Sequence, residues 1–210
     1  MSELFEQMAE KLYAGDADAV AELTQQALGE GHSAGEVLSQ GLVVGMDQVG
    51  VDFRSGELFV PEVLIAARAM HAGMDVLRPL LAEGDVESAG KVVVGTVSGD
   101  LHDIGKNLVV MMLEGGGFDV MDVGVDVAPQ AFVETVEKEQ PDIIGMSALL
   151  TTTMPSMGQT IDALTQAGVR DSVKIIIGGA PVTQAYADEI GADGYAPDAA
   201  SVVDLARALI

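Results

Sequence analysis

The chain has 210 residues, of which 49% are hydrophobic, and it carries 33 acidic against 10 basic side chains, a formal net charge of −23. This length suits one large domain or two small ones, and the apolar content is enough for a buried core, which excludes wholesale disorder. A surface this acidic repels nucleic-acid phosphates and anionic lipids. We therefore predict no nucleic-acid partner and no membrane partner.

Cysteine is absent from the sequence, which excludes disulfides, thiolate metal sites and cysteine nucleophiles. The opening residues, MSELFE, lack the basic segment of a signal peptide, and no apolar run approaches the roughly 20 residues of a membrane span. We expect a cytoplasmic protein.

The first part of the chain, residues 1–88, has the apolar spacing of helices. Asp16 suits a helix N-cap, Ser33 and Glu36 form a capping-box pattern, and Pro61 suits a first helical position. Four helices connected by short loops predict an antiparallel bundle. Their expected ranges are about 2–14, 17–29, 33–50 and 61–79.

A polar, glycine-bounded segment, residues 84–90, follows these helices. We interpret it as a linker between a helical domain, residues 1–88, and a second domain, residues 89–210. If the two domains move relative to each other during function, this linker is the expected hinge.

From Lys91 onward, β-branched apolar runs alternate with helical patterns. The alternation predicts an α/β domain with a doubly wound parallel sheet, Rossmann-like or flavodoxin-like, and right-handed crossovers. Strands are expected at 92–97, 118–123, 143–147, 174–177 and 194–195, and helices at about 103–114, 129–139, 155–167, 182–190 and 198–209.

Three short motifs lie at the ends of the first, third and fourth predicted strands or directly after them. The first is Asp100-Leu101-His102-Asp103-Ile104-Gly105, after the first strand; the second is Ser147 with Leu149, at the end of the third; the third is Gly178-Gly179, at the end of the fourth. Ligands of open α/β sheets bind at the carboxyl ends of the strands. All three motifs are therefore expected at one ligand-binding edge.

His102 is the candidate metal ligand. A neutral imidazole binds transition metals when a carboxylate orients its other nitrogen, and Asp100 is two residues away. One histidine cannot hold a bare metal ion, and no second histidine or dense acidic cluster accompanies it. A tetrapyrrole brings its own equatorial ligands and needs one axial ligand, which favours a corrinoid. Gly105 would let the backbone approach a flat macrocycle.

The motifs read D-x-H-x-x-G, S-x-L and G-G, with 41 residues between Gly105 and Ser147 (106–146) and 28 between Leu149 and Gly178 (150–177). In this order and spacing they resemble the cobalamin-binding signature of methionine synthase and of the small corrinoid proteins of methyltransferase systems. Residues 91–198 resemble the cobalamin-binding domain of that family, and residues 1–88 resemble its helical cap.

The resemblance implies a role for each motif residue. His102 would replace the cofactor's own base below the cobalt, a state called His-on/base-off, with Thr153 in place of a serine that completes the Asp100–His102 relay. The cap would shield the upper face of the corrin. The remaining implied contacts to cobalamin or a related corrinoid come from Asp103, Ile104, Gly105, Ser147, Leu149, Thr151, Gly178, Gly179, Phe59 and Met70.

The function implied by the resemblance is that of a methyl carrier, which is not catalytic alone. It would shuttle a methyl group on cobalt from a substrate-specific methyltransferase to an acceptor methyltransferase that uses tetrahydrofolate or a thiol cofactor, with a reductive activator as a further partner. Two alternatives remain open: a cobalamin-dependent sensor or regulatory module, and the small subunit of a corrinoid mutase. A flavodoxin-like domain without a corrinoid is the least specific interpretation.

Overall fold

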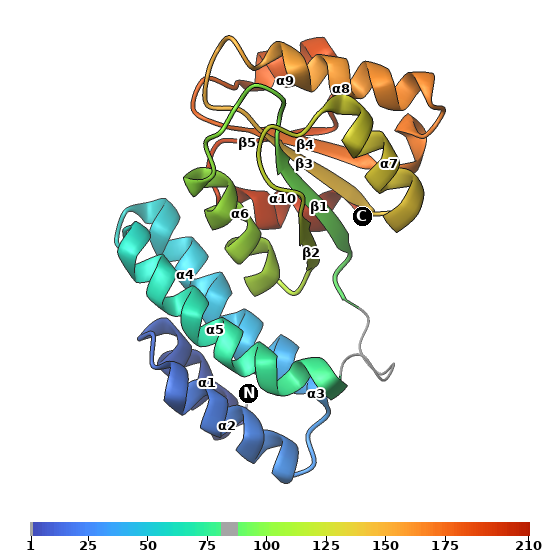
Figure 1. Ribbon diagram of the computed structural model, residues 1–210. Coiled ribbons are helices and arrows are strands. Elements are labelled where there is room, and N and C mark those ends of the chain that lie inside the picture. The colour runs from blue at the N-terminus through green and yellow to red at the C-terminus, as the bar shows by residue number, and fades with distance from the viewer. Residues whose placement is uncertain (1, 81–87) are drawn as a thin grey trace. The chain divides into compact units, whose positions relative to one another are not determined.

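The structure is a computed structural model that describes residues 2–80 and 88–210 (Figure 1). The described residues form two compact units. The first reaches Ala89 and includes Glu114–Gly117, and the second comprises Gly90–Leu113 and Phe118–Ile210. Residues 84–87 of the predicted linker lie outside the described residues.

The first unit is helical, and all four predicted helices are present. Ser2 caps the first helix by accepting a hydrogen bond from the Phe5 amide, and Asp16 caps the second in the same way through Ala19. Ser33 and Glu36 form the predicted capping box. The helices are α1 (Glu3–Tyr13), α2 (Ala17–Gly29), α3 (Ala34–Glu36), η1 (Val37–Leu42), α4 (Val43–Ser55) and α5 (Val60–Leu80).

The third predicted helix contains a feature that the sequence did not suggest. α3 and α4 are joined without a break by η1, a π-helical segment. The continuous helix formed by α3, η1 and α4 packs closely against α1. A Cβ added to Gly41 would lie 2.5 Å from Sδ of Met8, and a Cβ added to Gly45 would lie 3.1 Å from the carbonyl oxygen of Ala9. Glycine therefore permits a helix contact that any side chain would obstruct.

The apolar face of α1 illustrates why these helices associate. Phe5, Met8 and Leu12 recur every three or four residues and are fully or almost fully buried, which is the stripe expected of an amphipathic helix. Across residues 2–80 and 88–210, no helix is both long enough and apolar enough to cross a membrane.

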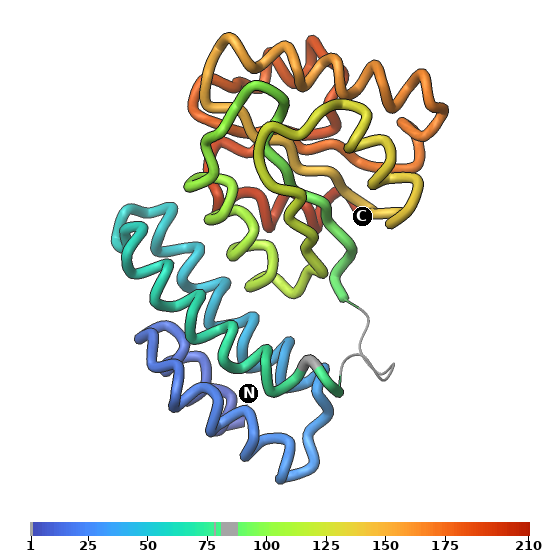
Figure 2. Tube along the Cα trace, viewed as in Figure 1, coloured from blue at the N-terminus to red at the C-terminus, as the bar shows by residue number. Residues whose placement is uncertain are grey.

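The second unit is the predicted α/β domain, and its strands alternate with helices along the chain. Figure 2 traces the path of the chain through it by colour. The strands are β1 (Lys91–Thr96), β2 (Asp119–Asp122), β3 (Ile143–Ser147), β4 (Lys174–Gly178) and β5 (Gly194–Ala196). The helices are α6 (Ile104–Gly115), α7 (Pro129–Glu139), α8 (Pro155–Gln166), η3 (Arg170–Ser172), α9 (Gln184–Ile190) and α10 (Ser201–Leu209).

All four strand pairings are parallel, and the order in the sheet is β2-β1-β3-β4-β5. This is the flavodoxin-like order, whose switch point lies between β1 and β3. Helices α7, α8 and α9 contribute to an apolar core on one face of the sheet, together with Ile144, Ile175 and Ile177. Helices α6 and α10 lie on the opposite face (Figure 1).

The strand register brings the predicted motifs to one edge. Thr96 at the end of β1 pairs with Ser147 at the end of β3, and Ser147 pairs in turn with Gly178 at the end of β4. The segments that follow these three strands therefore begin side by side at the carboxyl edge, on both sides of the switch point.

Candidate functional site

The first motif lies in the loop between β1 and α6. The loop turns back immediately after the strand, because the amide of Asp100 donates to the carbonyl oxygen of Val97 at 3.1 Å. Thr96, the last residue of β1, is buried, and its hydroxyl donates to the carbonyl oxygen of His102 at 2.9 Å. The strand end thus fixes both the start of the loop and the backbone of His102.

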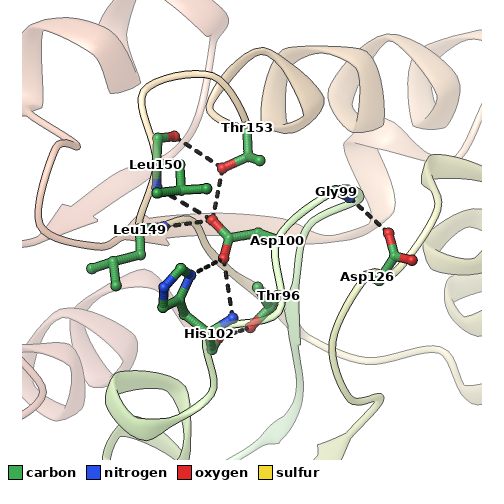
Figure 3. A network of polar contacts seen from close by, with 8 residues as sticks. All are labelled: Thr96, Gly99, Asp100, His102, Asp126, Leu149, Leu150 and Thr153. Atoms are coloured by element: carbon green, nitrogen blue, oxygen red, sulfur yellow. Dashed lines mark hydrogen bonds and ion pairs between the residues drawn. The ribbon is translucent and has the colours of Figure 1, made fainter.

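Asp100 and His102 form the centre of a polar network (Figure 3). The Nδ1 atom of His102 lies 2.6 Å from Oδ1 of Asp100, and the backbone amide of His102 donates to the same oxygen at 3.1 Å. The Asp100 side chain is fully buried, whereas half of the His102 side chain is exposed. A buried carboxylate therefore orients an accessible imidazole.

The second carboxylate oxygen of Asp100 is bound by the segment that follows β3. Oδ2 accepts hydrogen bonds from the Thr153 hydroxyl at 2.7 Å and from the backbone amides of Leu149 and Leu150 at 2.8 and 3.3 Å. The Thr153–Asp100 contact expected from the relay is present. Since Asp100 follows β1 and these donors follow β3, the network bridges the switch point of the sheet.

The protonation state of Asp100 follows from these contacts. Burial raises the pKa of the Asp100 carboxyl, but the hydrogen bonds from Thr153, from His102 and from the Leu149 amide outweigh burial and hold the pKa well below its usual range. An ionised carboxylate can only accept hydrogen bonds, so Nδ1 of His102 carries the ring proton. In the neutral form of the ring, the lone pair then resides on Nε2.

The surroundings of His102 fit a large, flat, mostly apolar ligand. Four leucine and isoleucine side chains on the two loops and at the start of α6 are exposed: Leu101 (71%), Ile104 (80%), Leu149 (42%) and Leu150 (42%). Within residues 2–80 and 88–210, no group of three or more metal-ligating side chains occurs. A single histidine among exposed apolar groups suits a metal whose other ligands come from its own macrocycle.

The glycines of the motifs behave in two different ways. A Cβ added to Gly105 would meet nothing within 4 Å, so the fold itself leaves this position open. Gly179 has φ +127°, and its Cβ would lie 1.9 Å from the carbonyl oxygen of Ala148. The resemblance implied that Gly178 and Gly179 contact the corrinoid; for Gly179, the fold also requires glycine because two backbones meet there.

The other predicted site residues occupy varied environments. At the carboxyl edge, Asp103 and Thr151 are exposed, while Ser147 is half-buried at the end of β3. In the helical unit, Phe59 is 65% exposed just before α5, whereas Met70 within α5 is buried.

Three contributors to this edge were not foreseen. Leu150 supplies a second amide to Asp100. Lys106, the residue after Gly105, is buried and its amine binds the Asp122 carboxylate. Asp126, after β2, accepts a hydrogen bond from the amide of Gly99 at 2.7 Å. Asp122 and Asp126 could have been sought from the sequence, because an acidic residue at the end of β2 or just after it must lie near this edge.

A flavodoxin-like sheet with one oriented, half-exposed imidazole at its switch point, framed by exposed apolar side chains, defines a tetrapyrrole-binding α/β protein. Comparison with known proteins gives the class more closely. Residues 90–204 match the family described as a B12 binding domain, and residues 4–78 match a second family with the same description.

Relatives of known class match almost the whole chain. Dimethylamine corrinoid protein 1 of Methanosarcina acetivorans is 46% identical over 209 residues, 99% of this chain and 98% of the relative. Trimethylamine corrinoid protein 1 of the same organism is 45% identical over 197 residues, 93% of this chain and 91% of the relative. The crystal structure of the methanol:cobalamin methyltransferase complex MtaBC from Methanosarcina barkeri contains a chain with a TM-score of 0.88 and 31% identity; the match covers 99% of this chain and 80% of that chain.

The chain therefore belongs to the family of B12-binding corrinoid proteins of methyltransferase systems, with a helical B12-binding cap followed by a Rossmann-like B12-binding domain. It binds a corrinoid and serves as a methyl carrier.

Proposed function

We propose that Nε2 of His102 is the axial ligand of the corrinoid cobalt and replaces the cofactor's own base. The observation that carries this proposal is the contact of His102 Nδ1 with the buried Asp100 carboxylate, which leaves the lone pair on the exposed side of the ring. Metal-ligating histidines typically donate their other ring proton to a carboxylate in this way, which fixes the tautomer and makes the ligating nitrogen a stronger donor.

The bound corrinoid supplies the chemistry, since its cobalt takes up a methyl group and gives it away. The residues of this chain orient the ligand and control its donor strength. Asp100 keeps the proton on Nδ1, and Thr153 with the Leu149 amide keeps Asp100 ionised. A proton added to this network would weaken the donation by Nε2, so the network is suited to adjust the axial bond as the cobalt changes state.

The exposed apolar residues and the open Gly105 position are the proposed contact surface for the lower face of the corrin. Leu149 lies on the loop that carries Thr153, and Ile104 and Gly105 begin α6 directly after the loop that carries His102. Ser147, Thr151, Gly178 and the cap residues Phe59 and Met70 are retained as further proposed contacts. Phe59 has the exposed aromatic surface that shielding of the upper face would use.

We further propose that the methyl donor is a methylamine or another small methylated compound delivered by a substrate-specific methyltransferase. Support comes from the names of the relatives, which are dimethylamine and trimethylamine corrinoid proteins, and from the methanol methyltransferase complex. The proposed second partner is an acceptor methyltransferase using tetrahydrofolate or a thiol, with a reductive activator that restores oxidised cobalt.

The axial-ligand proposal is tested by reconstituting the protein with cobalamin and recording its absorption spectrum, for the wild type, His102→Ala and the control His32→Ala. His32 lies in the helical unit, where its ring packs against Phe5. We expect wild type and His32→Ala to show the same histidine-coordinated, base-off spectrum, and His102→Ala to lose that coordination. Identical spectra for all three proteins would overturn the proposal.

A further inference from the structure

Asp126, in the loop between β2 and α7, has an unusual backbone conformation. Its φ angle is +53°, and it is one of two non-glycine residues with positive φ among the described residues. Such a conformation is uncommon for a residue with a side chain and persists where surrounding contacts fix it. The side chain is exposed, so burial does not account for it.

The contacts that fix Asp126 all lead to the loop that carries Asp100. Its carboxylate accepts hydrogen bonds from the amide of Gly99 at 2.7 Å and from the hydroxyl of Ser98 at 3.4 Å. Its own amide donates to the carbonyl oxygen of Asp100 at 3.0 Å. Asp126 therefore holds the backbone on both sides of the peptide that joins residues 99 and 100; Figure 3 shows its contact with Gly99.

The loop around Asp126 is itself aligned with the end of β1. The amide of Thr96 donates to the carbonyl oxygen of Gly124, and the amide of Val127 donates to the carbonyl oxygen of Thr96, both at 2.9 Å. Val97 and Val127 form a parallel bridge beyond the regular strands. The pairing of β1 with the β2 side thus continues past the strand ends and places Asp126 beside Gly99.

A second carboxylate of the same segment holds the far end of the motif. Asp122, the last residue of β2, binds the buried amine of Lys106, and its other oxygen accepts the amide of Gly124 at 2.8 Å. Asp122 and Asp126 therefore contact the motif at Lys106 and at Gly99, with Asp100 and His102 between these two points.

We propose that Asp126 is a positioning residue for the axial ligand, acting through the backbone of Asp100. Thr153, Leu149 and Leu150 hold the Asp100 carboxylate from the β3 side, and Asp126 holds its main chain from the β2 side. With one side released, Asp100 would still be bonded from the other side, but its direction, and hence the direction of the His102 ring, would vary. The inference rests on the proposed coordination of cobalt by His102.

Three substitutions separate the hydrogen bond from the backbone conformation. Asp126→Asn keeps an acceptor oxygen and is well suited to positive φ; Asp126→Gly keeps the conformation and loses the acceptor; Asp126→Ala loses both. Asp162→Ala is the control, because Asp162 is an exposed acid on α8 and its removal changes the net charge equally.

The first measurement is amide hydrogen exchange in the protein without corrinoid. We expect amide exchange at Gly99 and at His102 to accelerate about tenfold or more in Asp126→Gly and Asp126→Ala, while the exchange of the α8 amides stays unchanged. Asp126→Asn and Asp162→Ala should exchange like the wild type. The His102 amide is informative because it bonds to Asp100 and not to Asp126. A general loss of stability would accelerate the α8 amides as well, and that result would overturn the proposal.

The second measurement is cobalamin affinity, together with the fraction of bound cobalamin that shows histidine coordination. We expect Asp126→Gly and Asp126→Ala to bind cobalamin about tenfold more weakly, as is typical when a group that orients a metal ligand is removed. The fraction of bound cobalamin with histidine coordination should also be smaller in these two variants. Asp126→Asn should have the affinity and the coordinated fraction of the wild type. Unchanged exchange and unchanged coordination in the Gly and Ala variants would overturn the proposal. If the wild type itself lacks histidine coordination, the proposed function fails, while the exchange data still decide whether Asp126 holds the loop.

Discussion

Asp100 holds His102 through two bonds to one oxygen atom, since Oδ1 accepts both the backbone amide of His102 at 3.1 Å and the ring Nδ1 at 2.6 Å. The first bond closes a local turn of the kind that an aspartate makes with the residue two positions later. The second bond uses the same turn to orient the imidazole. This is a physical reason for the spacing of the aspartate and the histidine, because one intervening residue is what the turn requires.

Replacement of Asp100 by asparagine is expected to impair both folding and corrinoid binding. Five donor contacts converge on this carboxylate, and an amide offers one acceptor oxygen while turning two N–H donors toward other donors. We expect a loss of about 1–3 kcal/mol in the free energy of unfolding and a 10–100-fold weaker corrinoid affinity. Urea denaturation and equilibrium titration measure the two effects. An Asp100→Asn protein that matches an Asp162→Asn control in both would contradict the account.

The low pKa of Asp100 predicts how this contribution varies with pH. The unfolded chain takes up a proton at Asp100 near pH 4, whereas the folded protein keeps the carboxylate ionised to lower pH because of its hydrogen bonds. The contribution is therefore fully present above about pH 4 and declines as the pH falls further. The difference in unfolding free energy between wild type and Asp100→Asn, measured in urea, is expected to shrink below about pH 4. Because both proteins share every other carboxylate, a constant difference from pH 6 to pH 2.5 would be contrary evidence.

Much of this site could be predicted from the sequence because strand ends of a parallel sheet must meet at one edge. The alternation of strands and helices placed Asp100, Ser147 and Gly178 together, which follows from the order of elements. The hydroxyl of Thr153, which reaches Asp100, was implied by the resemblance to methionine synthase and not by the pattern of this sequence alone.

Other features could not be predicted, because they depend on contacts between segments far apart in the chain. The π-helical segment η1 has ordinary apolar spacing, and its geometry depends on packing. Asp126 acts on Gly99 only because its backbone takes a positive φ angle and because β1 and the loop after β2 remain aligned beyond the strands. The need for glycine at 179 comes from the backbone of Ala148, 31 residues earlier (179 − 148).

Thr153 is expected to act through its hydroxyl group. The hydroxyl lies 2.7 Å from Asp100 Oδ2 and 2.9 Å from the carbonyl oxygen of Leu150, and its single proton favours the charged carboxylate. Thr153→Val keeps the shape and removes the donor, so we expect a loss of about 1.5–3 kcal/mol, the range for hydrogen bonds to charged groups. Thr153→Ser keeps the donor and should stay within about 1 kcal/mol of wild type. Thermal unfolding of the two variants gives the comparison, and a Thr153→Val variant no less stable than Thr153→Ser would contradict a role for the hydroxyl.

Gly179→Ala is expected to disrupt the fold even without corrinoid. The added Cβ would meet the Ala148 carbonyl oxygen at 1.9 Å, and backbone atoms of two packed segments cannot move aside as a flexible side chain can. Because alanine at φ +127° is also strained, we expect Gly179→Ala to lower the free energy of unfolding by at least about 3 kcal/mol. Gly191→Ala is the matched control, because Gly191 has φ +75° but open space around it, and only about 1–2 kcal/mol is expected there. Similar losses for both variants would refute the close-approach argument.

Gly105→Ala, in contrast to Gly179→Ala, is expected to weaken corrinoid binding without destabilising the fold. Gly105 lies in the first turn of α6, its φ angle is not positive, and an added methyl group meets no protein atom within 4 Å. Alanine in a helix is favoured over glycine by about 0.5–1 kcal/mol, so the protein without corrinoid should be as stable as wild type or slightly more stable. If the corrin lies against this position, as proposed, the methyl group occupies space the macrocycle needs, and affinity should fall at least about tenfold, the effect of a misfit of roughly 1.4 kcal/mol. Gly158→Ala in α8 is the control, where the added methyl makes an ordinary 3.6 Å contact with Ile190. Cobalamin titration of the three proteins gives the answer, and a Gly105→Ala variant that binds as tightly as the control would move the proposed corrin surface away from the start of α6.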